Sequence, residues 1–263
     1  MNRYEGRRAL ITGAGSGIGQ STVLRLLSEG GTVVAADVSA DGLADTVAKA
    51  GDLGTRLSTV AMNIADEASV RAGVAEAVRT LGGLDVLVNA AGILRSSHTH
   101  ETSLELFEQV IRVNLIGTFL VIREAIPALL QGTKPAVVNF SSTSAMFAHP
   151  YMAAYAASKG GIQSMTHALA SEYSKQGIRF TAVQPGGISS GMTDGSGQSK
   201  QSVGPGFPAD IDFELLMKLV PAMSPEAGFP GPEKVSGVVA MLASDDGLFI
   251  TGTEVRVDGG THF

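Results

Sequence analysis

The chain has 263 residues, a length that suits one large α/β domain or two small ones. It contains no cysteine, which excludes disulfides, thiolate catalysis and cysteine-ligated metals and fits a reducing cytoplasm. The net charge of -6, with scattered lysines and arginines, argues against a nucleic-acid or anionic-lipid partner. The first residues lack the pattern of a signal peptide, and no apolar run reaches the ~18 residues of a membrane span. We therefore expect a cytoplasmic protein without membrane contact.

Short apolar runs alternate with longer amphipathic segments along the chain. Seven of these runs are continuous, as strands covered on both faces are, and lie at residues 9–11, 32–36, 57–62, 84–88, 136–140, 179–183 and 254–257. Helical periodicity predicts helices at 18–28, 70–81, 104–130 with a perturbation near Pro127, 153–175 and 233–243. The alternation predicts an α/β fold, a doubly wound (Rossmann) parallel sheet of about seven strands with helices on both faces. Residues 1–263 are expected to form a single domain.

One stretch, at about 189–230, breaks this alternation. It begins with glycines, continues with a short apolar helix for which Asp210 is the predicted N-cap, and closes with prolines. A connection of this length inside a domain is usually a lid or a binding loop. We predict a substrate lid, with a mobile surface insertion as the alternative. Its apolar side chains, among them Phe207, Phe213 and Leu216, suggest an apolar or bulky ligand.

The first predicted strand leads into a glycine-rich loop, Thr12-Gly13-Ala14-Gly15-Ser16-Gly17-Ile18-Gly19, which opens the first predicted helix. Glycines allow the backbone to approach a pyrophosphate closely, and a helix amino terminus supplies free N–H groups and a partial positive charge. The dinucleotide fingerprint requires this order of strand, loop and helix. The loop therefore predicts a dinucleotide site, with a glycine-rich turn that binds nothing as the alternative.

Asp37 ends the second predicted strand, where a dinucleotide-binding fold usually carries a carboxylate, about 20 residues after the loop. Such a carboxylate accepts hydrogen bonds from the adenosine ribose and repels a 2'-phosphate. Neither Ser16 nor Val38 offers a cation to offset that repulsion. We therefore predict NAD as the cofactor, rather than NADP. A solvated aspartate at a strand end is the alternative.

Tyr155 and Lys159 are four residues apart in an alanine-rich helical segment, which places both on one helix face. A phenol is a poor base at neutral pH, and a neighbouring ammonium group would lower its pKa. Such a pair alone is usually a surface pair. Here Ser142 follows the fifth predicted strand, Asn114 lies in the preceding helical segment, and Asn89 closes the fourth strand. These groups should converge at the carboxyl ends of the strands, where open α/β sheets bind ligands.

Together these motifs resemble the short-chain dehydrogenase/reductase family, from about Glu5 to Gly260. The resemblance rests on the glycine-rich loop and on these further elements: Asn89 to Gly92, Asn114, Ser142, Tyr155 with Lys159, Pro185-Gly186, and Val257 to Gly260. It implies an enzyme that transfers a hydride between NAD(H) and a secondary alcohol or ketone. It also implies a homotetramer, because members commonly associate through the helices that here contain Asn114 and Tyr155.

The resemblance assigns roles to the matching positions. Tyr155 would be the general acid/base, and Lys159 would lower the pKa of Tyr155 and hold the nicotinamide ribose. Ser142 would bind the substrate oxygen, and Asn114 would hold a water in a proton relay. The implied cofactor contacts are Gly13, Ser16, Gly17, Ile18, Gly19, Asp37, Asn63, Ile64, Asn89, Ala90, Ala91, Gly92, Tyr155, Lys159, Pro185, Gly186, Ile188 and Ser190. The implied substrate pocket consists of Leu94, Ser144, Met146, Gly187 and Met192.

Three positions depart from the family pattern: Ala90 stands for an asparagine, Asn63 for an aspartate and Ser190 for a threonine. No metal is expected, because His98, His100 and Glu101 make a poor ligand set.

Two alternative functions stay open. One is an NADPH-dependent 3-oxoacyl reductase of lipid metabolism, against which Asp37 argues. The other is a non-catalytic protein that binds and senses NAD, since a fold alone does not establish chemistry.

Overall fold

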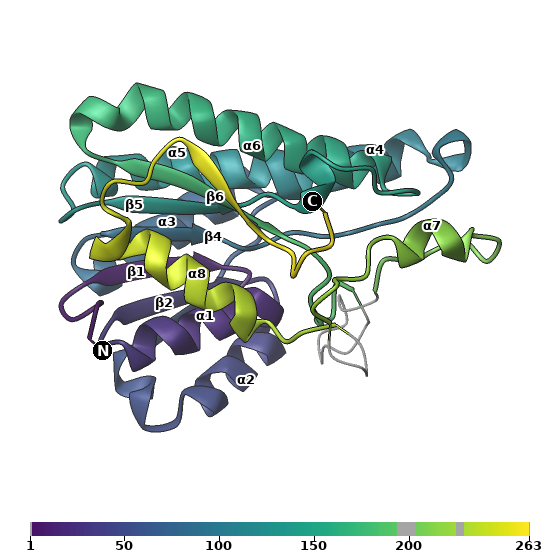
Figure 1. Cartoon of the computed structure of the whole chain (residues 1–263). Helices are drawn as coiled ribbons and strands as arrows, with labels where there is room; N and C mark the ends of the chain where they lie inside the picture. The colour runs from purple at the N-terminus through teal and green to yellow at the C-terminus, as the bar shows by residue number, and fades with distance from the viewer. Residues whose placement is uncertain (1, 194–203, 225–228, 263) are drawn as a thin grey trace.

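The computed structural model describes residues 2–193, 204–224 and 229–262. Seven strands form one parallel sheet in the order β3-β2-β1-β4-β5-β6-β7 (Figure 1). Their bounds are β1 Arg8–Thr12, β2 Thr32–Asp37, β3 Leu57–Ala61, β4 Val86–Asn89, β5 Ala136–Phe140, β6 Arg179–Pro185 and β7 Thr253–Val257. All seven predicted strands are present, and the predicted single-domain, doubly wound α/β fold is confirmed.

The sheet reverses its order at β1, which pairs with β2 on one side and β4 on the other. Leu10 is in register with Val34 of β2 and with Leu87 of β4. Since both crossovers leave from this point in opposite directions, a crevice forms beyond the carboxyl ends of β1 and β4. This crevice is where the sequence placed the ligand site.

Helices cover both faces of the sheet (Figure 1). One layer contains α1, α2 and α8, and the other contains α3, α4, α5 and α6. Neighbouring residues of a strand point into opposite layers: Ile11 packs in the first core and Leu10 in the second. The inner strands β1, β2, β4, β5 and β6 are mostly apolar because both of their faces are buried, whereas the edge strands β3 and β7 are partly exposed. The bounds are α1 Gly17–Ser28, α2 Ala40–Ala50, α3 Glu67–Leu81, α4 Leu104–Ile111, α5 Gly117–Leu129, α6 Ala153–Tyr173 and α8 Glu233–Ala243.

Two helices differ from the expectation. The segment 40–50 is a helix that the periodicity did not predict, although Ser39 caps it by accepting a hydrogen bond from the N–H of Gly42. The helix predicted over 104–130 is interrupted by a π-helical turn at Arg112–Ile116, whereas Pro127 lies inside the continuous helix α5. The expected perturbation at Pro127 is therefore wrong. The interruption lies around Asn114, whose side chain binds the backbone of another segment.

The segment that breaks the alternation contains a short helix, α7 (Phe213–Met217), which lies beyond the carboxyl ends of the strands (Figure 1). Its N-cap is Asp212, which accepts hydrogen bonds from the N–H groups of Glu214 and Leu215. The expected cap Asp210 instead contacts His98. Some of the glycines and prolines noted in the sequence of this stretch, among them Gly195, Gly197 and Pro225, lie outside the described residues. Within the described ranges, no helix combines the length and apolarity that a bilayer crossing requires.

Candidate active site

A cavity of about 840 Å³ lies at the carboxyl ends of the central strands. One end is lined by the glycine-rich loop and Asp37, and the other by Leu94, Tyr155 and residues of the 204–220 segment. Cavities that hold small ligands and cofactors are usually of this size and mostly apolar. Most of the predicted dinucleotide and substrate residues thus share one continuous site.

The glycine-rich loop brings β1, α1 and the loop after β4 into close contact. A Cβ on Gly13 would lie 2.6 Å from the backbone nitrogen of Ala91, and one on Gly19 would lie 2.1 Å from the carbonyl oxygen of Gly13. Gly13 also has φ +67°, which side chains other than glycine rarely adopt. Ser16 is the N-cap residue of α1, but its side chain accepts no capping hydrogen bond from the described N–H groups of the helix. The first N–H groups of that helix can therefore meet an anion, as the pyrophosphate of a dinucleotide requires.

Asp37 lies directly against this loop. Its Oδ2 accepts a hydrogen bond from the N–H of Gly15 at 2.9 Å, and its Oδ1 accepts one from the N–H of Ser39 at 2.8 Å. These bonds hold the carboxylate at the cavity wall. Of the described cations that line the cavity, Arg95, Arg112 and Lys159, none forms an ion pair with Asp37. This end of the cavity consequently carries an unpaired negative charge.

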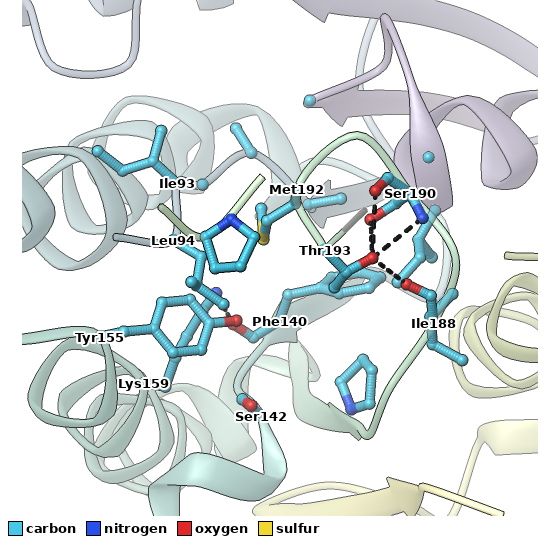
Figure 2. Close-up of a pocket in the computed structure, with 18 of the residues that line it drawn as sticks. Ile93, Leu94, Phe140, Ser142, Tyr155, Lys159, Ile188, Ser190, Met192 and Thr193 are labelled. Atoms are coloured by element: carbon cyan, nitrogen blue, oxygen red, sulfur yellow. Dashed lines mark hydrogen bonds between the residues drawn. The ribbon is translucent and has the colours of Figure 1, made fainter. Parts of the chain in front are cut away.

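Tyr155 lies in the first turn of α6, and Lys159 lies one turn further along the same helix. Both face the cavity, as does Ser142 from the loop after β5 (Figure 2). Tyr155 is 8% exposed, and burial raises the pKa of its phenol to about 12, while a hydrogen bond with Ser142 opposes that rise. Burial lowers the pKa of the Lys159 ammonium group to about 8. The lowering of the Tyr155 pKa expected from Lys159 is absent in this structure: burial raises this pKa, and the hydrogen bond with Ser142 opposes the rise.

Asn114 lies behind this group, buried within the π-helical turn. Its Oδ1 accepts a hydrogen bond from the N–H of Ile93 at 2.8 Å, and its Nδ2 donates to the carbonyl oxygen of Ile93 and to Ser158. A Cβ on Gly92 would lie 3.1 Å from Oδ1 of Asn114 and 3.7 Å from Nζ of Lys159. The structure therefore brings Asn114, Ser142, Tyr155 and Lys159 together around one loop.

Most of the other predicted residues line the cavity. These are Gly13, Ser16, Gly17, Ile18, Gly19, Asn63, Ile64, Ala90, Ala91, Gly92, Leu94, Pro185, Gly186, Gly187, Ile188, Ser190 and Met192. Asn89 does not: it is buried below the loop, where its Nδ2 donates to Oδ1 of Asn139 at 2.9 Å. It can support the cofactor site only through the backbone that follows it.

Two residues predicted for the substrate pocket do not line the cavity in this structure. Ser144 is buried in the protein and Met146 is 60% exposed to solvent, and neither lines the cavity. Ser144 lies in the 3-10 turn Thr143–Ala145 that follows Ser142, and Met146 lies directly after this turn. Thr143, His149 and Met152 of the same segment do line it. The pattern of apolar residues does not predict this turn. The local signal for it is Ser142, whose hydroxyl accepts a hydrogen bond from the N–H of Ser144.

The 204–220 segment closes the apolar end of the cavity. Phe207 and Leu219 pack in one cluster with Leu94, Met152 and Tyr155. Among the described residues, three polar contacts attach the segment to residues 96, 98 and 151. The N–H of Ser96 donates to the carbonyl of Pro205 at 2.8 Å, the N–H of Asp212 donates to the Tyr151 hydroxyl at 2.9 Å, and His98 Nε2 lies 3.0 Å from Asp210 Oδ1.

A doubly wound sheet with a glycine-rich loop at its reversal point and a buried Tyr–Lys pair beside it defines a class of nicotinamide-dependent oxidoreductases. Residues 7–201 match the family described as short chain dehydrogenase, and the chain belongs to that family. Its members use nicotinamide cofactors on small molecules and include enzymes that act on CH–OH groups.

Curated relatives cover nearly the whole chain. A 3-oxoacyl-[acyl-carrier-protein] reductase FabG of Thermotoga maritima is 35% identical over 98% of both chains. A cyclohexanol dehydrogenase of an Acinetobacter species is also 35% identical, over 98% of this chain and 96% of its own. The family thus includes relatives of similar identity that are named for different substrates.

Solved structures agree in fold. A short chain dehydrogenase from Mycobacterium paratuberculosis bound to NAD has a TM-score of 0.87 and 28% identity, with 98% of each chain covered. A short chain dehydrogenase from Burkholderia cenocepacia in complex with NADP has a TM-score of 0.84 and 29% identity, with 99% of each chain covered. Neighbours of comparable similarity are therefore bound to NAD in one case and to NADP in the other.

Proposed function

We propose that the protein is an NAD(H)-dependent oxidoreductase that interconverts a secondary alcohol and a ketone. The observation that carries this proposal is the convergence of Ser142, Tyr155 and Lys159 on the cavity that also contains the glycine-rich loop. In the oxidative direction an alcohol and NAD yield a ketone, NADH and a proton. When bound, the nicotinamide supplies the hydride acceptor, and every proton step falls to side chains of this chain.

The residues that line the cavity fit such a cofactor. The glycine-rich loop and the start of α1 would hold the pyrophosphate, and Asp37 would bind the adenosine ribose. Asn63 and Ile64 would flank the adenine. Ala90 to Gly92, Pro185, Gly186, Ile188 and Ser190 would surround the nicotinamide, with Asn89 supporting that backbone from below.

Tyr155 would move the proton. With a pKa of about 12 the phenol is protonated at neutral pH, so it carries the proton that ketone reduction consumes. Alcohol oxidation needs the phenolate, which the positive charge of Lys159 and of an oxidised nicotinamide would favour. Ser142 would donate a hydrogen bond to the substrate oxygen where negative charge develops. Asn114 and Lys159 both lie next to Gly92. Asn114 would hold a water in a proton relay behind Lys159.

Asp37 supports NAD over NADP. Its carboxylate would accept hydrogen bonds from ribose hydroxyls, and it would repel a phosphate at that position because no described cation pairs with it. The second candidate, an NADPH-dependent 3-oxoacyl reductase, is favoured by the relative of that name in Thermotoga maritima. Cofactor choice separates the two.

Thermal melting with NAD, NADH, NADP and NADPH tests the cofactor. A ligand at 100 times its dissociation constant adds about 2.7 kcal/mol to the free energy of unfolding. Stabilisation by NAD and NADH alone supports the proposal, and stabilisation by NADP and NADPH alone favours the acyl reductase. Turnover of a secondary-alcohol panel with NAD then tests the chemistry. Binding of NAD without turnover of any alcohol or ketone would instead favour a non-catalytic NAD sensor.

We also propose that the 189–230 segment is a substrate lid and that the protein is a homotetramer. Leu104, Phe107 and Phe119 are exposed apolar side chains on α4 and α5, which flank Asn114. The family resemblance implies association through this helical segment and through α6, which contains Tyr155. Burial of these side chains against further copies would remove apolar surface from water. Light scattering of the purified protein distinguishes a tetramer from smaller species.

A further inference from the structure

Arg95 is a partly buried cation at the substrate end of the cavity, in the loop after β4. Its Nη1 donates to the carbonyl oxygen of the adjacent residue, Leu94, at 2.7 Å. Within the described ranges this is its only hydrogen bond, and no carboxylate pairs with it. A guanidinium group has five N–H donors in a planar fork, so most of its donors are left for a ligand or water.

The other guanidinium groups of similar or greater burial are better satisfied. Arg8 pairs with Asp85 at 2.9 Å, and Arg179 donates to the backbone carbonyls of residues 242, 244, 247 and 250. Arg112 also lines the cavity, but it is exposed and donates to the carbonyl of Ala65 beside the predicted adenine position. Arg95 is therefore an unusual feature of the substrate end, because this fold otherwise supplies partners for its partly buried arginines.

The position of Arg95 follows from its two neighbours in the chain. Leu94 packs with Tyr155 and Met152, whereas the N–H of Ser96 binds the carbonyl of Pro205 in the 204–220 segment. Arg95 thus lies between the Tyr155 side of the cavity and the segment that closes it. The apolar walls strengthen the field of a charge there. Asp37 is the only acid among the described lining residues, and it lies at the opposite end.

We propose that Arg95 binds a carboxylate of the substrate, which makes the substrate a hydroxy acid or oxo acid rather than a neutral alcohol. This inference rests on the proposed function, because it takes the reacting CH–OH group to be at Tyr155. An apolar part of the substrate lies between the reacting carbon and the carboxylate, against Leu94, Met152 and Phe207. The planar fork of an arginine matches both oxygens of a carboxylate, and such charge-assisted pairs are stronger than neutral hydrogen bonds.

Turnover of a matched pair of ketones tests this proposal. The pair is 4-oxocyclohexanecarboxylate and 4-methylcyclohexanone, reduced with NADH. The wild-type protein should prefer the carboxylate, and Arg95→Met should lower kcat/KM for it by roughly 10- to 100-fold while changing the neutral ketone by less than about threefold. Arg95→Lys, which keeps the charge but not the fork, should give an intermediate value. Arg112→Met removes a second cation of the cavity and should keep the preference for the carboxylate.

Binding measured without turnover keeps the two proposals separate. Calorimetry with NAD-saturated protein uses cyclohexanecarboxylate, a series of linear carboxylates and the corresponding methyl esters. None of these ligands has a ketone or hydroxyl group that could react. Carboxylate binding that Arg95→Met weakens by at least about tenfold supports the inference, even if no ketone is turned over and the proposed function fails. Failure of every carboxylate to bind, equal binding by both proteins, or equal loss of carboxylate and ester would overturn it. Turnover of neutral ketones with no preference for the carboxylate also overturns it and leaves the proposed function intact.

Discussion

Nζ of Lys159 lies 5.6 Å from the centre of the Tyr155 ring, and the ammonium group donates to the carbonyl oxygen of Phe140 at 2.7 Å. Both side chains are buried at the cavity, with few partners for the charged form of either group. The structure thus shows a phenol and an ammonium group that burial drives toward their neutral forms. A positively charged nicotinamide would change this balance in favour of the phenolate, because opposite charges at close range favour ionisation.

Replacement of Tyr155 by phenylalanine should reduce turnover by roughly 10² to 10⁴, the usual contribution of general acid/base catalysis. The dissociation constant for NADH should stay near the wild-type value, because the ring and its packing are kept. Steady-state kinetics and a fluorescence titration with NADH measure the two quantities. A fully active Tyr155→Phe protein would contradict the proposed mechanism.

Replacement of Asp37 by asparagine should shift the cofactor preference toward NADP by roughly tenfold or more, because it removes a charged acceptor for the ribose and a repulsive charge. Asp41→Asn is the matched control, since Asp41 lies in the first turn of α2 and does not line the cavity. Dissociation constants for NAD and NADP measured with all three proteins give the result. An unchanged ratio in Asp37→Asn would remove the argument for NAD.

The buried Lys159 should make stability depend on pH. Its pKa is lowered from 10.5 to about 8 in the folded protein, so between these values the unfolded chain binds a proton that the folded chain does not. The free energy of unfolding contributed by this group therefore rises with pH from about 8 to 10.5. For a chain of this size each kcal/mol changes Tm by about 2–4 °C.

Melting of the wild type and of Lys159→Met across that pH window tests this linkage. The variant should lose the rise in Tm between pH 8 and 10.5. Tyr155 opposes the trend only at higher pH, since its raised pKa makes stability fall above pH 10. Identical pH profiles for the two proteins would mean that Lys159 is not protonated differently in the folded state.

Gly19→Ala should destabilise the protein strongly, because the added Cβ would lie 2.1 Å from the carbonyl oxygen of Gly13. The loss should be several kcal/mol, on the order of 3, as for other overpacked sites. Gly54→Ala is the control, because a Cβ there meets nothing within 4 Å and the position has no positive φ. Chemical denaturation should show a large decrease in the free energy of unfolding for Gly19→Ala alone.

The 204–220 segment should be held less firmly as pH rises. The neighbouring Asp210 raises the pKa of His98, so the ion pair is present below that pKa and is lost as pH rises through it. Because both groups are accessible to solvent, the effect on KM should be small, about two- to threefold. KM should therefore increase with pH above 6.5 in the wild type and stay flat in Asp210→Asn. Tyr151→Phe, which removes the contact with Asp212, should raise KM at every pH without this dependence.

The order of elements and the position of the site could be predicted from the sequence. Continuous apolar runs, helical periods and the loop from Gly13 to Gly19 are local signals, because each reflects burial or backbone conformation within a few residues. The spacing of Tyr155 and Lys159 on one helix face has the same local origin. These signals were enough to predict seven strands and a ligand site at their carboxyl ends, whereas the strand order and its reversal at β1 came from the structure.

Only the tertiary structure determined which way side chains point in irregular segments. The turn after Ser142 directs Ser144 inward and Met146 outward, and Asn89 binds Asn139 instead of lining the cavity. The interruption at Asn114 and the contact of Asp210 with His98 join segments that are far apart in the chain. Such orientations follow from long-range packing and hydrogen bonds, which leave no periodic signal in the sequence. The isolated position of Arg95 at the substrate end of the cavity has the same origin, since it depends on which groups the fold leaves unpaired.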